Sequence, residues 1–207
     1  MFVTFEGIEG SGKSTQIKIL KKALEKIHFD VELTREPGWG KIGKLIRTII
    51  LDIEDLDLHP FSEVSLFCAD RAQHVKEFIK PMLNKGKIVL CDRYYDSTIA
   101  YQAHGRGLNL DLIKNMANAS TLGVYPNVTI LLDISVNTAL SRIVERPGRN
   151  KIDDESFEFH SRVKKAYLGI AEKSSCVHII NGEEDELVVH ENIKKCLSSN
   201  FSIFSRL

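Results

Sequence analysis

Five short apolar runs recur along the chain, and the segments between them are long enough to hold helices. The runs cover Phe2–Phe5, Val31–Arg35, Ile88–Cys91, Val128–Leu132 and Val177–Ile180. The third and fourth are almost continuously apolar, which is typical of strands covered on both faces. The second alternates apolar and polar residues, so it is expected nearer a sheet edge. The pattern predicts an α/β fold with a parallel sheet and right-handed crossovers.

Between these runs, apolar residues return at every third or fourth position, as on one face of an amphipathic helix. After Ser14 this spacing relates Ile17, Leu20, Leu24 and Ile27. Further helices are predicted over residues 42–51, 61–83, 110–122, 136–144, 157–171 and 187–197. The irregular stretches 52–59 and 146–151 are expected to be surface loops, the second a candidate lid. For the tail, residues 198–207, both docking and fraying stay open.

Composition narrows the function classes. The 207 residues are 43% apolar and carry 28 basic and 28 acidic side chains, so the formal net charge is zero. We expect one folded domain over residues 1–207 with no nucleic-acid partner, because a dedicated nucleic-acid binder carries a basic excess. The four cysteines have no metal-like spacing, and no apolar run approaches the length of a membrane span. A cytoplasmic protein without a membrane partner is therefore expected.

The strongest chemical signal lies between the first predicted strand and the first predicted helix. Its residues are Gly7, Ile8, Glu9, Gly10, Ser11, Gly12, Lys13 and Ser14, followed by Thr15. This is a full match to G-x-x-x-x-G-K-[ST] in the strand–loop–helix context that the motif requires. Glycines let backbone N–H groups curl around phosphate oxygens, Lys13 reaches the β- and γ-phosphates, and the Ser14 hydroxyl reaches Mg²⁺. The motif predicts a nucleoside triphosphate site.

The loop lacks part of the positive charge that phosphoryl transfer needs. Glu9 would repel a triphosphate, so its side chain is expected to face outward, toward the phosphoryl acceptor. Arg142 and Arg146 stand four residues apart, on one helix face, and Arg149 follows a Pro-Gly break that lets the chain fold over the phosphates. We expect a lid over about residues 142–158 that carries these cations. A solvated basic face is the alternative.

Two aspartates follow apolar runs and could serve the phosphate loop. Asp92 is followed at once by Arg93, which places an acid for the metal and a guanidinium for phosphate together at a strand's carboxyl end. Asp133 precedes a helical pattern, so it is expected to be an entry-turn or capping residue. Residues 150–153 spell the N-K-x-D pattern of GTPases, but no D-x-x-G occurs in the chain. A GTPase switch is therefore disfavoured.

With these residues in hand, the chain resembles the thymidylate kinase family in its bacterial form. The resemblance spans Phe2 to about Ala171 and is carried by residues 6–15, Thr34–Gly38, Ala69–His74, Asp92–Tyr94 and Ala100–Gln102. It implies transfer of the γ-phosphate of ATP to dTMP, with Mg²⁺, in dTTP synthesis. It also implies the three-layer P-loop nucleoside monophosphate kinase fold, with a five-stranded parallel sheet in the order 2-3-1-4-5, a small lid and a homodimer.

The resemblance assigns a pocket for the acceptor base. Phe67 is implied to stack on thymine, and Arg71, four residues later on the same helix face, to donate to a thymine carbonyl. Ser97 and Thr98 match positions that reach the base edge, and Pro37 lines the pocket.

The resemblance also assigns the rest of the acceptor site. Glu9 and Tyr101 match positions around the deoxyribose 3′-hydroxyl, with Gln102 adjacent to them. Arg47 and Arg93 match the clamp on the acceptor phosphate. The outward direction expected for Glu9 agrees with this assignment.

The implied mechanism is direct in-line transfer without a covalent enzyme intermediate. The residues implied to be catalytic are Lys13, Asp92, Arg93, Arg146 and Arg149, while Ser14 and Asp92 hold the metal and Arg142 belongs to the ATP site. No general base is required, since the acceptor phosphate is already an anion. Two rivals stay open: another nucleotide or nucleoside kinase of the same fold, and a nucleotide-binding regulator without a small acceptor.

Two places depart from the family pattern. Trp39 stands where Gly usually follows Glu-Pro-Gly, and Asn150-Lys151 stands where the lid often reads Asp-Arg. Trp39 is the only tryptophan, and its position beside Pro37 and Gly38 puts it on the acceptor loop. We expect its fluorescence to respond to dTMP. The alternative is that Trp39 packs on the protein away from the site.

Overall fold

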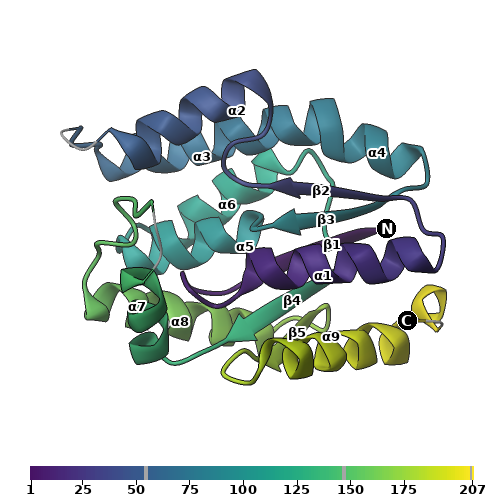
Figure 1. Cartoon of the computed structure of the whole chain (residues 1–207). Coiled ribbons are helices and arrows are strands. Elements are labelled where there is room, and N and C mark those ends of the chain that lie inside the picture. The colour runs from purple at the N-terminus through teal and green to yellow at the C-terminus, as the bar shows by residue number, and fades with distance from the viewer. Residues whose placement is uncertain (54–55, 146–147, 206) are drawn as a thin grey trace.

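Five parallel strands form one sheet, as the sequence predicts. The computed structural model describes residues 1–53, 56–145, 148–205 and 207. The strands are β1 (Phe2–Glu6), β2 (Val31–Arg35), β3 (Ile88–Asp92), β4 (Val128–Asp133) and β5 (Val177–Asn181). Neighbours pair in parallel in the order β2-β3-β1-β4-β5, the order that the resemblance implies (Figure 1). The alternating strand β2 lies at an edge, as expected.

Helices connect the strands and cover the sheet. They are α1 (Lys13–Lys26), α2 (Gly40–Arg47), α3 (Pro60–His74), α4 (Lys80–Asn84), α5 (Tyr95–Thr98), α6 (Leu110–Ser120), α7 (Val136–Val144), α8 (Phe157–Ala171) and α9 (Glu186–Asn200). The π-helical turns Thr48–Asp52, Val75–Ile79 and Ile99–Gly105 extend α2, α3 and α5, and the 3₁₀ turn Ser202–Phe204 follows α9. Among the described helices, none combines the length and the apolar character that crossing a bilayer requires.

The two-residue period of the strands explains the layers. Val3 and Phe5 of β1 face the side covered by α1 and α9, where they share one apolar cluster with Leu20 and Ile193. Phe2 faces the opposite side and packs with the continuation of α3. All five residues of β1 are buried, and Phe2 and Val3 are apolar on opposite faces of the sheet.

The sequence pattern does not predict the helical segment formed by α5 and its π-helical continuation. Residues 99–103 are all buried, so no polar face marks a helical period. The helix predicted over residues 61–83 is present, but a π-helical turn interrupts it just before Pro81, which cannot donate a backbone hydrogen bond. The tail docks: Phe204 is buried, with its ring centre 6.1 Å from that of Phe29.

Parallel strands bring their carboxyl ends to one edge of the sheet. In the register of the sheet, Phe5 pairs with Asp92 of β3, and Glu6 pairs with Leu131 of β4. The loop between β1 and α1 therefore starts between the ends of β3 and β4, on the side of the molecule where α7 lies (Figure 1). Ligands of open parallel sheets bind at this edge.

Candidate active site

A cavity of about 610 Å³ lies at the carboxyl edge of the sheet. Its walls come from the phosphate loop, the ends of β2 and β3, α3, α5 with its π-helical continuation, α7 and the segment after β5. The sequence-predicted residues that line it are Glu9, Gly10, Ser11, Gly12, Lys13, Ser14, Thr15, Pro37, Arg47, Phe67, Arg71, Asp92, Arg93, Ser97, Thr98, Tyr101, Gln102 and Arg142. One cavity thus brings together residues from distant parts of the chain.

The phosphate loop has a backbone that only its glycines permit. Gly7 has φ +139°, and a Cβ there would lie 2.5 Å from the carbonyl oxygen of Leu132. Gly10 has φ +74°, and a Cβ there would lie 2.8 Å from the carbonyl oxygen of Ala139. No side chain of the described residues caps α1 at Gly12. The first N–H groups of this helix and the positive end of its dipole are therefore available to an anion.

Lys13 is folded back into this loop. Its Nζ donates to the carbonyl oxygens of Gly7 and Ile8, at 3.0 and 2.8 Å, and to Ser11 Oγ at 3.2 Å. Gly7 and Ile8 therefore contact Lys13 through their carbonyl oxygens, and neither is among the described residues that line the cavity. Burial, and then the charge of Arg93, lower the pKa of Lys13 to about 8 against the opposing effect of nearby carboxylates.

Ser14 and Asp92 meet, as a shared metal site requires. Ser14 Oγ donates to Asp92 Oδ2 at 2.6 Å, which links the start of α1 to the end of β3. A hydroxyl and a carboxylate are hard oxygen donors that suit Mg²⁺, and this ion takes most of its other ligands from water and phosphate. The donor set fits the ion, although the described residues hold no cluster of three acidic, His or Cys ligands.

Asp133 has a different place from Asp92. It is the last residue of β4, and its Oδ1 pairs with Lys164 Nζ of α8 at 2.6 Å. Of the two roles expected for Asp133, capping is wrong, because Ser135 caps α7: its Oγ accepts the N–H of Thr138 at 3.0 Å. Asp133 stays at the strand end, where the chain turns toward the helix.

Arg93 connects the phosphate loop to other walls of the cavity. Its Nη2 pairs with Glu9 Oε1 at 2.6 Å, and its Nη1 donates to the carbonyl oxygen of Gly7 at 3.0 Å and to the Tyr167 hydroxyl at 3.2 Å. The guanidinium carbon lies 4.9 Å from the centre of the Tyr101 ring. Arg93 holds a left-handed backbone conformation with φ 70°, which is strained for such a side chain and typical of functional sites.

Glu9 is buried and yet favours its charged form. Burial raises the pKa of its carboxyl, but the charges of Arg93 and Lys13 and a hydrogen bond from the Tyr101 hydroxyl outweigh it, so the pKa lies below its ordinary value. Its partner Arg93 directly follows β3, and Tyr101 belongs to the π-helical continuation of α5. The carboxylate therefore faces Arg93 and Tyr101 and not the first turn of α1.

A second buried carboxylate, Glu6, bonds to residues that contact the Arg93 guanidinium. It accepts hydrogen bonds from the Tyr94 N–H at 2.7 Å, from Ser97 Oγ at 2.6 Å and from the Tyr167 hydroxyl at 2.8 Å. Burial raises the pKa of Glu6 in spite of these bonds and of the nearby Arg93 charge. Ser97 and Tyr167 in turn contact the Arg93 guanidinium, at 3.3 and 3.2 Å, so Glu6 helps to fix its position.

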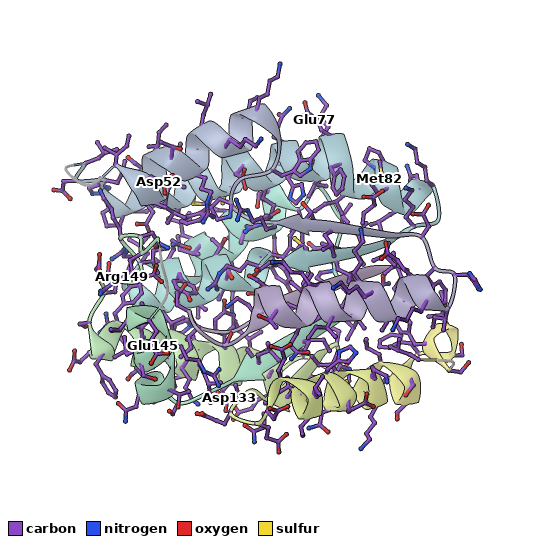
Figure 2. The ribbon with its side chains drawn as sticks, viewed as in Figure 1. Asp52, Glu77, Met82, Asp133, Glu145 and Arg149 are labelled. Atoms are coloured by element: carbon purple, nitrogen blue, oxygen red, sulfur yellow. The ribbon has the colours of Figure 1, made fainter. Side chains whose placement is uncertain are left out.

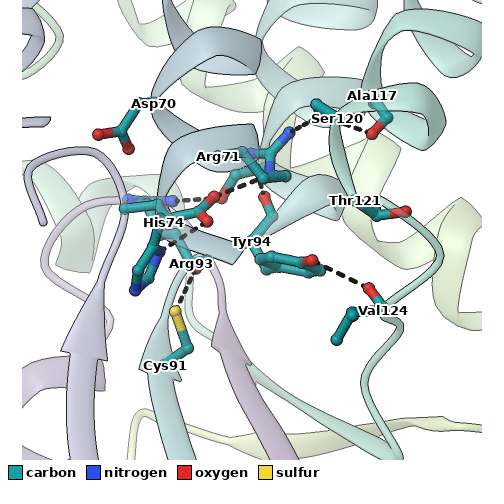
Figure 3. Close-up of polar contacts among 12 residues, drawn as sticks. Asp70, Arg71, His74, Cys91, Arg93, Tyr94, Ala117, Ser120, Thr121 and Val124 are labelled. Carbon is teal, nitrogen blue, oxygen red and sulfur yellow. Dashed lines mark hydrogen bonds and ion pairs between the residues drawn. The ribbon is translucent and has the colours of Figure 1, made fainter. Parts of the chain in front are cut away.

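Arg71 is buried in α3 and held by hydrogen bonds from three directions (Figure 3). Its Nε donates to Glu36 Oε2 at 2.8 Å, its Nη2 to the Tyr94 carbonyl oxygen at 3.1 Å, and its Nη1 to Ser120 Oγ at 3.4 Å. Phe67, one turn earlier on α3, lines the same cavity. An aromatic face and a guanidinium edge on one helix can hold a planar base that carries carbonyl groups.

Other residues predicted to bind the phosphoryl acceptor line the same cavity as Phe67 and Arg71. Arg47 Nη1 donates to the Pro37 carbonyl oxygen at 3.1 Å, which ties α2 to the loop after β2. Gln102 Nε2 donates to Glu63 Oε1 at 2.9 Å, so its amide nitrogen already has a protein partner. Thr98 is buried at the cavity wall.

Arg142 of α7 is fixed across the phosphate loop. Its Nη1 donates to the carbonyl oxygen of Gly10 at 3.1 Å and to that of Gly182 at 3.3 Å. The side chain thus connects α7, the phosphate loop and the segment after β5 at one end of the cavity.

Gly148, Asn150 and Ile152 of the segment after α7 line the cavity, but Arg149 is not among the described residues that line it. Arg149 is exposed and pairs with Asp154 on the loop before α8, where Figure 2 labels Arg149. Arg146 lies outside the described residues. Lys151 Nζ donates to the carbonyl oxygen of Leu56 at 2.6 Å, so this segment touches the loop that precedes α3. Of the cations expected over the phosphates, Arg142 therefore lies at the phosphate loop and Arg149 does not.

Comparison with known proteins decides the family. A family model described as thymidylate kinase matches residues 5–193. A thymidylate kinase of Desulfovibrio desulfuricans is 46% identical over 180 residues, which cover 84% of this chain and 83% of that protein. The chain belongs to the thymidylate kinase family. A relative of the same name in Halothermothrix orenii is 43% identical over 203 residues, with 95% and 98% covered.

A solved structure agrees with the thymidylate kinase family. The crystal structure of thymidylate kinase from Ehrlichia chaffeensis superposes with a TM-score of 0.78 at 35% sequence identity. The match covers 95% of this chain and 98% of that one. The family resemblance that the sequence motifs carry is therefore confirmed, together with the fold.

Some residues that line the cavity have no sequence motif of their own. Gly182, Glu184, Glu186 and Val189 line it from the segment after β5 and the start of α9, beyond Arg142. The available signal is positional: this segment follows the carboxyl end of a parallel strand, where α/β proteins bind ligands.

Trp39 does not line the cavity, as far as the described residues show. Its ring centre lies 5.5 Å from that of His74, in a stacked arrangement, and 5.0 Å from that of Phe78. Of the two places expected for Trp39, the structure shows the packed one, because the end of α3 and its π-helical continuation each present a ring to it.

The low pKa of Lys13 predicts a basic limb in the rate profile. With ATP absent, Lys13 loses its proton as pH rises through about 8, and a neutral amine cannot balance phosphate charge, so kcat/KM for ATP should fall there. Bound phosphates favour the ammonium, so kcat should persist to higher pH. Initial rates between about pH 7 and 10 measure both limbs.

A variant of an exposed lysine on the same helix, Lys18→Ala, is the matched control and should keep the wild-type profile. A kcat/KM for ATP that stays flat from about pH 7 to 10 would contradict the assignment.

Proposed function

We propose that the chain phosphorylates dTMP to dTDP with the γ-phosphate of ATP, as a step of dTTP synthesis for DNA. The observation that carries the proposal is the single cavity. It joins a phosphate loop without a side-chain cap among the described residues to the Phe67–Arg71 pair, with Arg93 between them. Membership of the thymidylate kinase family supports the same reaction.

The donor half would bind ATP through the phosphate loop, Gly7–Thr15, with Arg142 beside it. The α1 N–H groups would hold the phosphates, and Lys13 would exchange its carbonyl contacts for β- and γ-phosphate oxygens. Ser14 and Asp92 would hold Mg²⁺, which when bound neutralises charge on the phosphoryl group in transit.

The acceptor half would hold dTMP. We assign its binding to Glu9, Pro37, Arg47, Phe67, Arg71, Arg93, Ser97, Thr98, Tyr101 and Gln102. Phe67 would stack on thymine while Arg71 donates to a base carbonyl, and the Glu9–Tyr101 pair, joined by a hydrogen bond, would face the sugar hydroxyl. Arg47 and Arg93 would orient the acceptor phosphate.

Transfer would be direct and in line, without a covalent enzyme intermediate. The acceptor phosphate is an anion at neutral pH, so no side chain needs to remove a proton from it. The task of Lys13, Asp92 and Arg93 would be to position the two nucleotides and to balance the charge of the moving group.

We further propose that residues 142–158 form a lid on a single domain, residues 1–207. Closure would bring Arg146 and Arg149 to the phosphates and exclude water, which would otherwise receive the phosphoryl group. A homodimer in the cytoplasm completes the proposal, on the strength of the family resemblance.

A panel of acceptors tests the proposed reaction. With ATP and Mg²⁺ fixed, ADP formation is measured with dTMP, dUMP, dCMP, dAMP, dGMP and UMP, and with thymidine, while chromatography identifies the diphosphate. We expect the highest kcat/KM with dTMP, and Lys13→Ala should abolish it. A higher kcat/KM with another acceptor would assign a different kinase of the same fold. ADP formation that no acceptor stimulates would indicate a nucleotide-binding regulator.

The lid assignment predicts a split effect for Arg149→Ala. A cation that reaches the phosphates only on closure acts in the transition state, so kcat should fall at least about a hundredfold while the calorimetric Kd for dTMP changes less than about threefold. Asp154→Asn is the matched control, since it removes only the partner that Arg149 has in this structure. It should leave kcat within about threefold. An unchanged kcat in Arg149→Ala would make the arginine a surface partner of Asp154 alone.

A further inference from the structure

Side chains at helical spacing lead from the cavity along α3 into its π-helical continuation. Phe67 and Arg71 line the cavity. His74 follows three residues after Arg71, and Phe78 follows four residues after His74. The His74 and Phe78 rings stack with their centres 5.9 Å apart, and Trp39, just before α2, packs on both. Trp39 thus covers the part of the stripe that lies away from the cavity.

Glu36 connects this aromatic cluster to Arg71. Its Oε2 accepts from Arg71 Nε at 2.8 Å, and its Oε1 lies 3.0 Å from His74 Nδ1. A carboxylate can only accept, so Nδ1 carries the proton. The other ring nitrogen lies 2.6 Å from Thr34 Oγ1 of β2. Hydrogen bonds therefore fix the imidazole at both nitrogens while two rings stack on it.

These contacts set the direction of the Arg71 donors. A guanidinium group has five N–H donors, and Glu36, Tyr94 and Ser120 take three of them within the described residues. Two donors remain for a ligand in the cavity. Because the group is planar and rigid, the position of Glu36 determines where those two donors point.

We propose that His74 and Trp39 are positioning residues for the acceptor base. Trp39 packs on the imidazole of His74, the imidazole donates to Glu36, and Glu36 orients the Arg71 guanidinium toward a base carbonyl. Trp39 and His74 do not line the cavity among the described residues, yet they determine the affinity for the acceptor nucleotide and the choice of base. The inference rests on the proposed function only for the identity of the base. The chemical step, at the phosphate loop and Arg93, is not part of this chain of contacts.

The test compares variants that break the chain of contacts with variants that preserve it. Trp39→Ala and His74→Leu should each raise KM and the calorimetric Kd for dTMP about tenfold. His74→Leu removes the donor to the buried Glu36 carboxylate, and Trp39→Ala removes the ring that stacks on that donor. They should leave kcat and KM for ATP within about threefold. The preference for dTMP over dCMP, which carries an amine in place of a carbonyl, should shrink. Trp39→Phe and His74→Asn, which keep a ring and a donor, should restore wild-type values.

A matched control removes another ring that stacks on a histidine of the same helix region. Phe61 stacks on His59 at 6.1 Å near the start of α3, and Phe61→Ala should leave every constant unchanged. An unchanged Kd for dTMP in Trp39→Ala would overturn the inference. So would a loss in which kcat and KM for ATP change as much as KM for dTMP, since that indicates general damage to the fold.

The emission of Trp39 gives a readout independent of turnover. It is the only tryptophan, and its stack on His74 connects it through Glu36 to Arg71. Saturating dTMP should change its emission in the wild-type enzyme and in Phe61→Ala but not in Glu36→Gln, and equal responses in all three would overturn the inference. If the acceptor panel selects another monophosphate, the proposed substrate fails, and the same variants measured with that acceptor decide the positioning role by the same criteria.

Discussion

The ion pair between Arg93 and Glu9 is the interaction on which the site depends. Burying either charge alone would be costly, but together, at 2.6 Å, each compensates the other, and Glu9 keeps its charge in spite of burial. The pair crosses from the end of β3 to the loop after β1. Its second guanidinium nitrogen reaches α5 and α8 through Ser97 and Tyr167. One side chain therefore connects several of the elements that surround the cavity.

The Glu9–Arg93 pair fixes the orientation of a cation in the wall of the cavity. Phosphoryl transfer requires fixed positive charge close to the moving group, and charge that is already oriented needs no reorganisation during the reaction. Arg93 carries the strain of a left-handed backbone to hold this orientation. Lys13 shows the opposite tendency: without phosphate, burial and the neighbouring guanidinium lower its pKa, so its full charge develops best when a polyanion arrives. The cavity thus combines Arg93, whose pKa is raised, with a lysine whose pKa is lowered to about 8.

The sequence predicts the sheet well because its central strands are covered on both faces. The continuous apolar runs 88–91 and 128–132 have no other simple explanation, and the strand order follows from the family resemblance. The phosphate loop is equally clear, since Gly10 and Gly12 permit a backbone that other residues cannot adopt. The role of Asp133 is harder to predict, because an entry turn and a helix cap both fit an aspartate before a helical pattern. The structure decides it: β4 ends at Asp133, and Ser135 caps α7.

Other parts of the site depend on contacts between distant residues, which local patterns do not encode. The segment 99–105 is helical but buried on nearly all sides, so it carries no amphipathic period. The residues after β5 line the cavity because of where the strand ends, not because of their type. Trp39 lies in a Gly-rich loop that suggests an exposed position near the acceptor. Its actual place depends on His74 and Phe78, which come from a different helix.

The most direct test of the central role of Arg93 and Glu9 is a double-mutant cycle on stability. The free energy of unfolding is measured by urea denaturation for the wild type, Arg93→Met, Glu9→Gln and the double variant. Each single change leaves its partner buried without an opposite charge, whereas the double change removes both charges. The double variant should therefore lose less stability than the sum of the single losses, by at least about 1 kcal/mol. Losses that add to within about 0.5 kcal/mol would show that the two charges are not coupled and would contradict the account.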